Sequence, residues 1–234
     1  MQFEPPLIRA RLIKRYKRFL ADVELSDGSL VTAHCANPGA MTGLKDEGQA
    51  VWLQPSTNPA RKLKFSWILV DHGSGTFTGV DTSLPNKLVK EALEARQIEA
   101  LAHYTTIKPE QKYKQNSRID FLLSGPGSQD LYLEVKSVTL RRSEALAEFP
   151  DTVTTRGTKH LRALAEVVQH GSRAMMFYLV QRNDCERVAL ARDIDPDYAN
   201  ACAEARKAGV EILAYACEIS PNGVNLGPPL PFLG

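Results

Sequence analysis

Two short runs hold the residue types in this chain best suited to metal chemistry. Asp120 lies in the apolar stretch 118–122, and Glu134 and Lys136 lie in the stretch 131–137. Side chains alternate between the two faces of a strand, so Glu134 and Lys136 share one face and the apolar residues between them share the other. Two carboxylates and one lysine on neighbouring strands could bind a divalent cation and direct water at a phosphodiester. Asp120, Glu134 and Lys136 are therefore the candidate catalytic residues.

The turn between these runs predicts how they face each other. Residues 124–128 read Ser-Gly-Pro-Gly-Ser, and a symmetric hairpin centred on Gly127 places Asp120 directly across from Glu134. Directly opposed residues have Cβ atoms roughly 4.5 to 5.5 Å apart, and like charges there are destabilising. A cation would remove that repulsion, and Mg²⁺ binds proteins through one or two carboxylates while keeping waters and phosphate oxygens. We expect Asp120 and Glu134 to hold Mg²⁺ or Mn²⁺, unless a bulge shifts the register.

The Glu-x-Lys spacing alone carries little information. The chain holds a second copy, Glu110-Gln111-Lys112, as expected by chance for such common residues. Asp120 on a partner strand adds weight to the first copy. The alternative is an ordinary exposed strand face on which charges alternate.

A helix upstream of the hairpin offers a third carboxylate. Pro85 suits the first turn of a helix that continues to residue 95. At 100° per residue its apolar residues form one stripe, which Glu91 flanks while Glu94 points nearly opposite. Glu91 is the candidate third metal ligand, and a solvated helix edge is the equal alternative.

Residues 1–82 have an almost purely strand-like pattern. Alternating stretches occur at 7–12, 19–25, 30–34, 51–53, 63–70 and 76–80. Turn residues such as Asp27-Gly28 separate them. Several short strands without a helix predict a small OB-like β-barrel. We expect residues 34–39 to form a structural loop in which Asn37 satisfies backbone groups.

Residues 83–234 have a different pattern. We expect helices at 84–95, 156–169 and 195–209, and strands at 118–123, 131–138, 173–180 and 210–219. The strand at 173–180 is apolar at nearly every position, which is typical of a strand buried on both faces. The order predicts a mixed-sheet α/β domain.

A cationic stretch precedes the first predicted turn. It contains no acidic residue, and Tyr16 and Phe19 are interleaved with its six basic residues: Arg9, Arg11, Lys14, Arg15, Lys17 and Arg18. Cations for phosphates beside rings for stacking are typical of OB surfaces that bind single strands. A basic edge strand that resists aggregation is the alternative.

Further cations lie in the second half of the chain. Arg156, Lys159 and His160 share one face of the second helix, whose N-terminus can itself bind phosphate. We group Arg118, on the hairpin, with these candidate nucleic-acid contacts. The alternative for the helix residues is a surface cluster without a ligand.

Charge is distributed unevenly although the net charge is only +2. Residues 1–82 hold 10 basic and 8 acidic side chains, and without the stretch 9–18 they hold 4 and 8. The total therefore conceals one cationic stretch, and this distribution favours a nucleic-acid partner.

The chain resembles the sugar fermentation stimulation protein family. The similarity lies in Lys17-Arg18-Phe19-Leu20-Ala21-Asp22-Val23, His34-Cys35-Ala36-Asn37-Pro38-Gly39-Ala40-Met41, Ser117-Arg118-Ile119-Asp120-Phe121, Glu134-Val135-Lys136-Ser137-Val138-Thr139-Leu140, Phe149-Pro150-Asp151 and Arg156-Gly157-Thr158-Lys159-His160-Leu161. Asp120 and Glu134-Val135-Lys136 also resemble the PD-(D/E)xK signature of restriction-endonuclease-like proteins, although no Pro precedes Asp120.

The resemblance implies an OB-like domain, a nuclease-like domain, DNA binding and a role in regulating sugar catabolism genes. Three hypotheses follow: a Mg²⁺- or Mn²⁺-dependent deoxyribonuclease, a non-catalytic DNA-binding regulator of maltose-type genes, and an enzyme acting on a small phosphorylated metabolite. The last lacks a Gly-rich phosphate loop. We expect single- or double-stranded DNA as partner, without strong sequence specificity, and leave a homodimer open.

Composition is that of an ordinary globular protein. Its 43% hydrophobic and 24% charged residues exclude disorder, collagen and coiled coil. No apolar run approaches the roughly 20 residues of a membrane span, and no secretory signal is visible, so we expect a cytoplasmic protein without a membrane partner. Its four scattered cysteines argue against a zinc ribbon.

Overall fold

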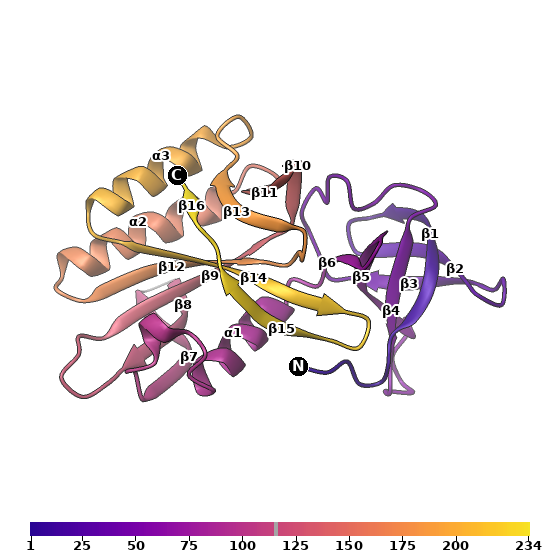
Figure 1. Ribbon diagram of the computed structural model, residues 1–234, viewed down its shortest axis with the longest axis horizontal. Helices are drawn as coiled ribbons and strands as arrows, with labels where there is room; N and C mark the ends of the chain where they lie inside the picture. The colour runs from indigo at the N-terminus through magenta and orange to yellow at the C-terminus, as the bar shows by residue number, and fades with distance from the viewer. Residues whose placement is uncertain (115–116) are drawn as a thin grey trace.

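The first six strands form one sheet, and five of them close into a barrel. In this computed structural model, which describes residues 1–114 and 117–234, they are β1 (Ile8–Tyr16), β2 (Leu20–Leu25), β3 (Leu30–Cys35), β4 (Ala50–Pro55), β5 (Phe65–Gly73) and β6 (Thr76–Gly79). Their order is β3-β2-β1-β4-β5-β6, and a β3–β5 pairing closes the barrel (Figure 1). Alternate residues such as Leu12, Val23, Leu53 and Trp67 fill the interior. The predicted OB barrel is confirmed.

A six-stranded mixed sheet forms the centre of the second domain. It contains β7 (Thr106–Lys114), β8 (Ser117–Ser124), β9 (Leu131–Val138), β12 (Arg173–Val180), β14 (Glu211–Ser220) and β15 (Gly223–Pro229), in the order β15-β14-β12-β9-β8-β7. β12 is parallel to both of its neighbours, β9 and β14. All of β12 except its first residue is buried, as its apolar sequence predicts.

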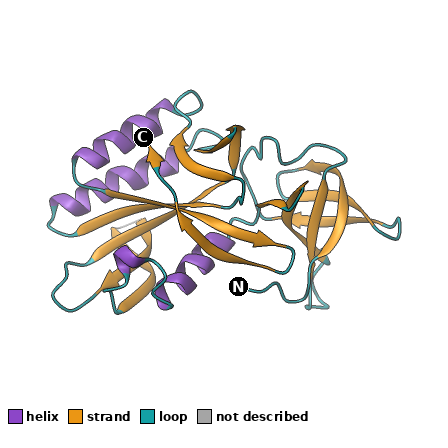
Figure 2. Ribbon diagram, viewed as in Figure 1, coloured by secondary structure: helices purple, strands orange, loops and turns teal. Residues whose placement is uncertain are grey.

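Helices cover both faces of this sheet (Figure 2). α1 (Leu84–Glu94) packs on one face, and α2 (Thr155–Gln169) and α3 (Pro196–Lys207) pack on the other (Figure 1). A short 3-10 helix, Glu99–Leu101, follows α1. Thr154 caps α2 by accepting from Gly157 N, and Asp195 caps α3 by accepting from Tyr198 N. The predicted mixed α/β domain is confirmed.

A second, smaller sheet was absent from the sequence prediction. It consists of β10 (Leu140–Ser143), β11 (Ala145–Phe149), β13 (Cys185–Leu190) and β16 (Phe232–Leu233), in the order β10-β11-β13-β16. These strands are short, and β11–β13 and β13–β16 are parallel pairs between distant segments, which local periodicity does not reveal. The edge strands β7 and β15 of the central sheet were missed as well.

The loop after β3 joins the barrel to the α/β domain. Asn37 Nδ2 donates to Val80 O at 3.1 Å, and Gly39 N donates to Asn37 Oδ1 at 2.8 Å. Met41 N then donates to Asp151 Oδ2 at 3.0 Å, across the junction. Asn37 thus satisfies backbone groups, and its loop is fixed to both domains.

A cavity of about 170 Å³ lies at this junction. The barrel contributes Asn37 and Gly39 to its lining, and the α/β domain contributes Ser137, Thr139 and Asp151. The carboxyl end of β9 and the barrel loop therefore line the same cavity. Within the described parts of the chain, no helix is long and apolar enough to cross a membrane.

Candidate active site

The β8–β9 hairpin has the register that the sequence predicts. Phe121 pairs with Leu133, and Leu123 pairs with Leu131. The ladder ends where Asp120 reaches β9, and there the Asp120 carboxylate accepts a hydrogen bond from Val135 N at 2.8 Å. Asp120 thus lies against the strand that carries Glu134 and Lys136.

Asp120 is held from two directions. Its Oδ2 accepts from Val135 N, and its Oδ1 accepts from Asn86 Nδ2, on α1, at 2.8 Å. Burial raises the pKa of Asp120, and the nearby charge of Glu134 raises it further, against the opposing effect of the Val135 N–H, Asn86 and Lys136. The carboxylate is therefore fixed in place while its negative charge is disfavoured, which is a suitable state for binding a cation.

Glu134 is deeply buried, with only 3% of its surface exposed. Lys136 Nζ donates to Glu134 Oε1 at 2.6 Å, and His160 Nδ1 bonds the same oxygen. Burial acts to raise the pKa of Glu134, but the His160 hydrogen bond and the Lys136 charge outweigh it, so the net shift is downward. The pKa values of Asp120 and Glu134 are thus shifted in opposite directions, as in many catalytic pairs.

His160 extends this cluster to α2. Arg156 Nε donates to His160 Nε2 at 3.3 Å, which assigns the proton of a neutral ring to Nδ1, facing Glu134. Lys136 Nζ lies 3.3 Å from the same Nδ1. We predicted His160 as a phosphate contact, but this geometry favours a role in positioning Glu134. The i,i+4 spacing of Arg156 and His160 was the sequence signal for their contact.

Glu91 does not join the carboxylate pair. Its side chain is 51% exposed and forms an ion pair with the amine of Met1 at 3.4 Å. On α1 it is Asn86, one helical turn and more upstream, that contacts Asp120. The prediction of Glu91 as a metal ligand therefore lacks support from this geometry, because the helix presents an amide to the site instead.

Acidic side chains of the barrel pair with three of the six cations in the cationic stretch. Arg9 Nε lies 3.6 Å from Asp71, Arg11 Nε donates to Glu24 at 2.9 Å, and Lys14 Nζ lies 3.7 Å from Asp22. Asp22 and Glu24 lie on the neighbouring strand β2 and Asp71 lies on β5, so the stretch is less cationic than its sequence suggests.

The end of the stretch is different. Arg15 donates to the carbonyl oxygens of Asn37 and Gly39 at 2.7 and 3.2 Å, and so supports the junction loop. Lys17 and Arg18 are exposed in the β1–β2 turn, and neither forms an ion pair with a described residue. They are the cations of the stretch that remain available to a ligand.

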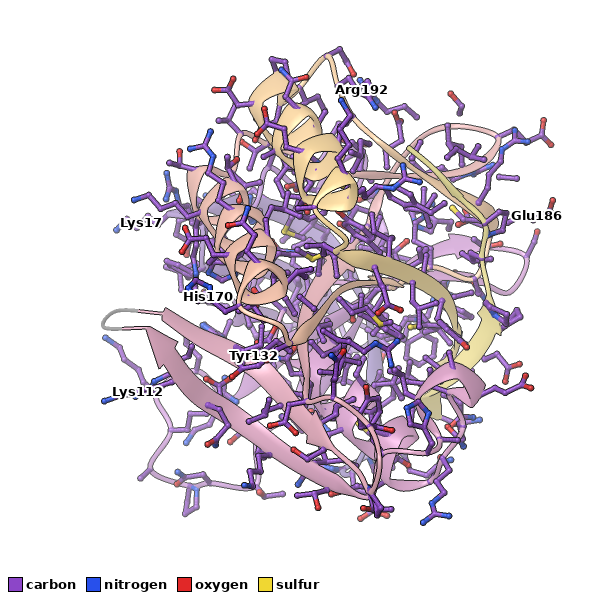
Figure 3. All side chains as sticks on the ribbon, turned by 90° about the vertical axis from the view of Figure 1, so that its left-hand side faces the viewer. Lys17, Lys112, Tyr132, His170, Glu186 and Arg192 are labelled. Atoms are coloured by element: carbon purple, nitrogen blue, oxygen red, sulfur yellow. The ribbon has the colours of Figure 1, made fainter. Side chains whose placement is uncertain are left out.

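The α/β domain has exposed cations of its own. Arg118, Arg156 and Lys159 are exposed, and Arg118 pairs with Lys112 across the β7–β8 hairpin. Figure 3 shows Lys17 of the barrel and Lys112 of β7 projecting at the same edge. One basic side chain of each domain therefore points toward this side of the molecule.

The carboxylate pair is the basis of any metal site here. Across residues 1–114 and 117–234, no three or more His, Cys, Asp or Glu side chains lie close enough to form a metal cluster. Mg²⁺ needs only one or two protein carboxylates, because water and phosphate oxygens complete its shell. Asp120 and Glu134 meet this smaller requirement.

An OB barrel followed by a mixed-sheet domain with Asp, Glu and Lys on adjacent strands defines a two-domain protein with a restriction-endonuclease-like fold. Residues 83–223 match the family described as "Sugar fermentation stimulation protein RE domain", and residues 13–80 match "SfsA N-terminal OB domain". The chain belongs to the sugar fermentation stimulation protein family.

Individual relatives agree over the full length. A sugar fermentation stimulation protein homolog of Ruegeria pomeroyi is 61% identical over 98% of this chain and 100% of its own. One from Jannaschia is 56% identical, over 99% of this chain and 96% of its own. The solved structure of Pyrococcus furiosus SfsA, in complex with Ca²⁺, is 24% identical and superposes over both whole chains with a TM-score of 0.89. This last likeness supports the fold.

Proposed function

We propose that this protein binds DNA and hydrolyses its phosphodiester bonds at Asp120, Glu134 and Lys136 with Mg²⁺ or Mn²⁺. The observation that carries the proposal is the convergence of the three side chains, with Asp120 bonded to the Glu134 strand and Lys136 Nζ 2.6 Å from Glu134. Catalytic sites are where such opposed pKa shifts concentrate.

The two carboxylates suit a divalent metal. Burial and the charge of Glu134 both raise the pKa of Asp120, and a cation between the carboxylates would relieve this repulsion. The Ca²⁺ complex of Pyrococcus furiosus SfsA supports metal binding in the family. When bound, the metal would polarise a phosphoryl oxygen and lower the pKa of a water.

The surrounding residues have distinct roles in this proposal. Lys136 can direct the attacking water and stabilise the charge that develops on the phosphate. His160 and Asn86 act as positioning residues, because each bonds a carboxylate from a helix. The backbone N–H of Val135 fixes Asp120 without depending on a rotamer.

DNA contact is supported by exposed cations in both domains. Lys17 and Arg18 of the barrel, with Arg118, Arg156 and Lys159 of the α/β domain, would contact phosphates. Arg9, Arg11, Lys14 and Arg15 would contribute less, since each already bonds within the protein.

Cleavage assays on single-stranded, duplex and flapped DNA test the proposal directly. Activity should require Mg²⁺ or Mn²⁺ and should be lost in Glu134→Gln. Glu91→Gln serves as the matched control, because it removes a carboxylate of the same domain that lies outside the site. Full absence of cleavage on all three substrates would refute hydrolysis.

A non-catalytic regulator of sugar catabolism genes is the second candidate. It is favoured by the contacts of Glu134 with Lys136 and His160, which balance the charge of this carboxylate within the protein. Under this alternative, DNA binding should persist without cleavage and should weaken steeply with salt. A salt-independent affinity would exclude both candidates.

A further inference from the structure

The β1–β2 turn combines an exposed ring with unpaired cations. Phe19 is 46% exposed, which is unusual for an aromatic residue of this chain, and it stacks on His34 with ring centroids 6.5 Å apart and an interplanar angle of 14°. Lys17 and Arg18 precede it in the same turn. We call these four residues the stacking patch.

The turn is rigid and holds the ring outward. Lys17 and Arg18 have φ values of 48° and 61°, in the left-handed region that costs energy for residues other than glycine. Phe19 N donates to Lys17 O at 2.8 Å, and Phe19 O accepts from Cys35 N at 2.9 Å. The turn is therefore fixed to β3, and its ring is presented at little further entropic cost.

The stacking patch lies at the end of the barrel nearest the α/β domain. His34 pairs with Leu20 on β2, and three residues beyond His34 the chain enters the loop that bonds Asp151. The opposite end of the same strands carries Leu30, another exposed apolar residue, about 13 Å away at roughly 3.3 Å per residue. The patch is thus at the same end of the barrel as the loop that contacts the α/β domain.

We propose that Phe19, backed by His34, stacks on an unpaired base of single-stranded DNA while Lys17 and Arg18 bind the flanking phosphates. The flat, apolar face of a base can stack on the ring of Phe19, and the phosphates can bind the cations of Lys17 and Arg18. The stacking patch therefore matches both parts of a nucleotide. Within a duplex the base faces are already stacked, so a ring at a surface turn favours an unpaired strand. This inference rests on the proposed DNA binding and adds the strand class.

Binding to oligothymidylate, and to the same strand annealed to oligoadenylate, tests this in EDTA, where hydrolysis cannot interfere. Phe19→Ala should weaken single-strand binding about 5- to 100-fold and duplex binding less than about 2-fold. Phe19→Tyr should restore single-strand affinity, and Leu30→Ala should change neither. An equal loss on both substrates would overturn the inference.

Fluorescence gives a readout that a general loss of DNA affinity would not reproduce. In Phe19→Trp, oligothymidylate should quench the added emission, after subtraction of the native Trp52 and Trp67 signal. Leu30→Trp, at the far end of the barrel, should not respond. If Phe19→Trp binds oligothymidylate and its emission is not quenched, the stacking inference is wrong although DNA binding stands. If the wild type binds neither the single strand nor the duplex, the proposed function itself is wrong.

Discussion

The carboxylate of Asp120 accepts a hydrogen bond from the backbone N–H of Val135 at 2.8 Å, and this bond replaces the next rung of the β8–β9 ladder. Phe121 packs in the core beneath α1, whereas Ile119 packs in the core beneath α2. Residues two apart would face the same side of a regular strand, so β8 twists at Asp120. The twist leaves the Asp120 carboxylate against β9, the strand that carries Glu134 and Lys136.

Replacing Asp120 with Asn should abolish cleavage while preserving the fold. The amide lacks the charge that a metal requires, although it can still accept from Val135 N. We expect activity to fall at least about 100-fold, and added Mg²⁺ should no longer raise the melting temperature. Calorimetry with Mn²⁺ measures the loss of metal binding separately. Wild-type activity in this variant would contradict the assignment.

The stability of the metal-free protein should depend on the two carboxylates in opposite ways. Because the folded-state pKa of Asp120 is raised, its contribution to the free energy of unfolding is present below the unfolded pKa and is lost as pH rises through the folded pKa. Because the folded-state pKa of Glu134 is lowered, its contribution is present above the unfolded pKa and is lost as pH falls through the folded value.

Thermal melts in EDTA across acidic pH separate these effects. Asp120→Asn should gain stability relative to wild type as pH rises, and Glu134→Gln should lose it. In wild type, stabilisation by Mg²⁺ should grow with pH until Asp120 has lost its proton. Melting curves that shift in parallel at every pH would argue against coupling between these groups.

His160→Ala should reduce cleavage about 10- to 100-fold, the typical cost of losing a residue that orients a metal ligand. His160→Asn is the matched variant, because its amide nitrogen can take the place of Nδ1 beside Glu134. Recovery by Asn, but not by Ala, would show positioning of Glu134. If DNA affinity fell with activity in both variants, His160 would be a phosphate contact as the sequence first indicated.

Salt titration of DNA binding should distinguish the available cations from those paired within the barrel. Lys17→Gln should lower the slope of log affinity against log salt by about 1, the contribution of one phosphate contact. Arg11→Gln should change it little, because Arg11 is already paired with Glu24. Equal effects of the two substitutions would indicate that DNA binding breaks the internal ion pair.

Gly39→Ala should destabilise the junction between the domains. A Cβ there would lie 2.7 Å from Asp151 Oδ2, so either the loop or the acid must move. We expect a cost of about 1–3 kcal/mol. In the double variant with Asp151→Ala the clash is removed, so the two costs should be less than additive in denaturant melts.

The sequence predicted the register of the β8–β9 hairpin because its signals were local. A symmetric turn around Gly127 and strict alternation set the register of Asp120 and Glu134, and the paired rungs up to Phe121 and Leu133 follow that register. The angular position of a residue on α1 was a weaker guide to the site. Glu91 and Asn86 both flank the apolar stripe of α1, and only the way the helix packs on the sheet places Asn86 against Asp120.

Other features required knowledge of distant neighbours. The ion pair of Arg9 with Asp71 joins strands that are far apart in sequence. The sequence alone therefore predicted that Arg9 was free to bind a nucleic acid. Likewise β11 and β13 are parallel partners separated by α2 and β12, and each is too short to show a period by itself.

The loop that bonds Asp151 affects where a bound DNA strand would be cut. It bonds Asp151 of the α/β domain and lines a cavity together with Ser137, the residue after Lys136. This contact between the two domains helps to set the span from Phe19 to Lys136. A strand held at one end and cut at the other would be cleaved at a constant number of nucleotides from the held base, whatever its sequence. The position of the cut would then depend on the distance from Phe19 and not on the base sequence.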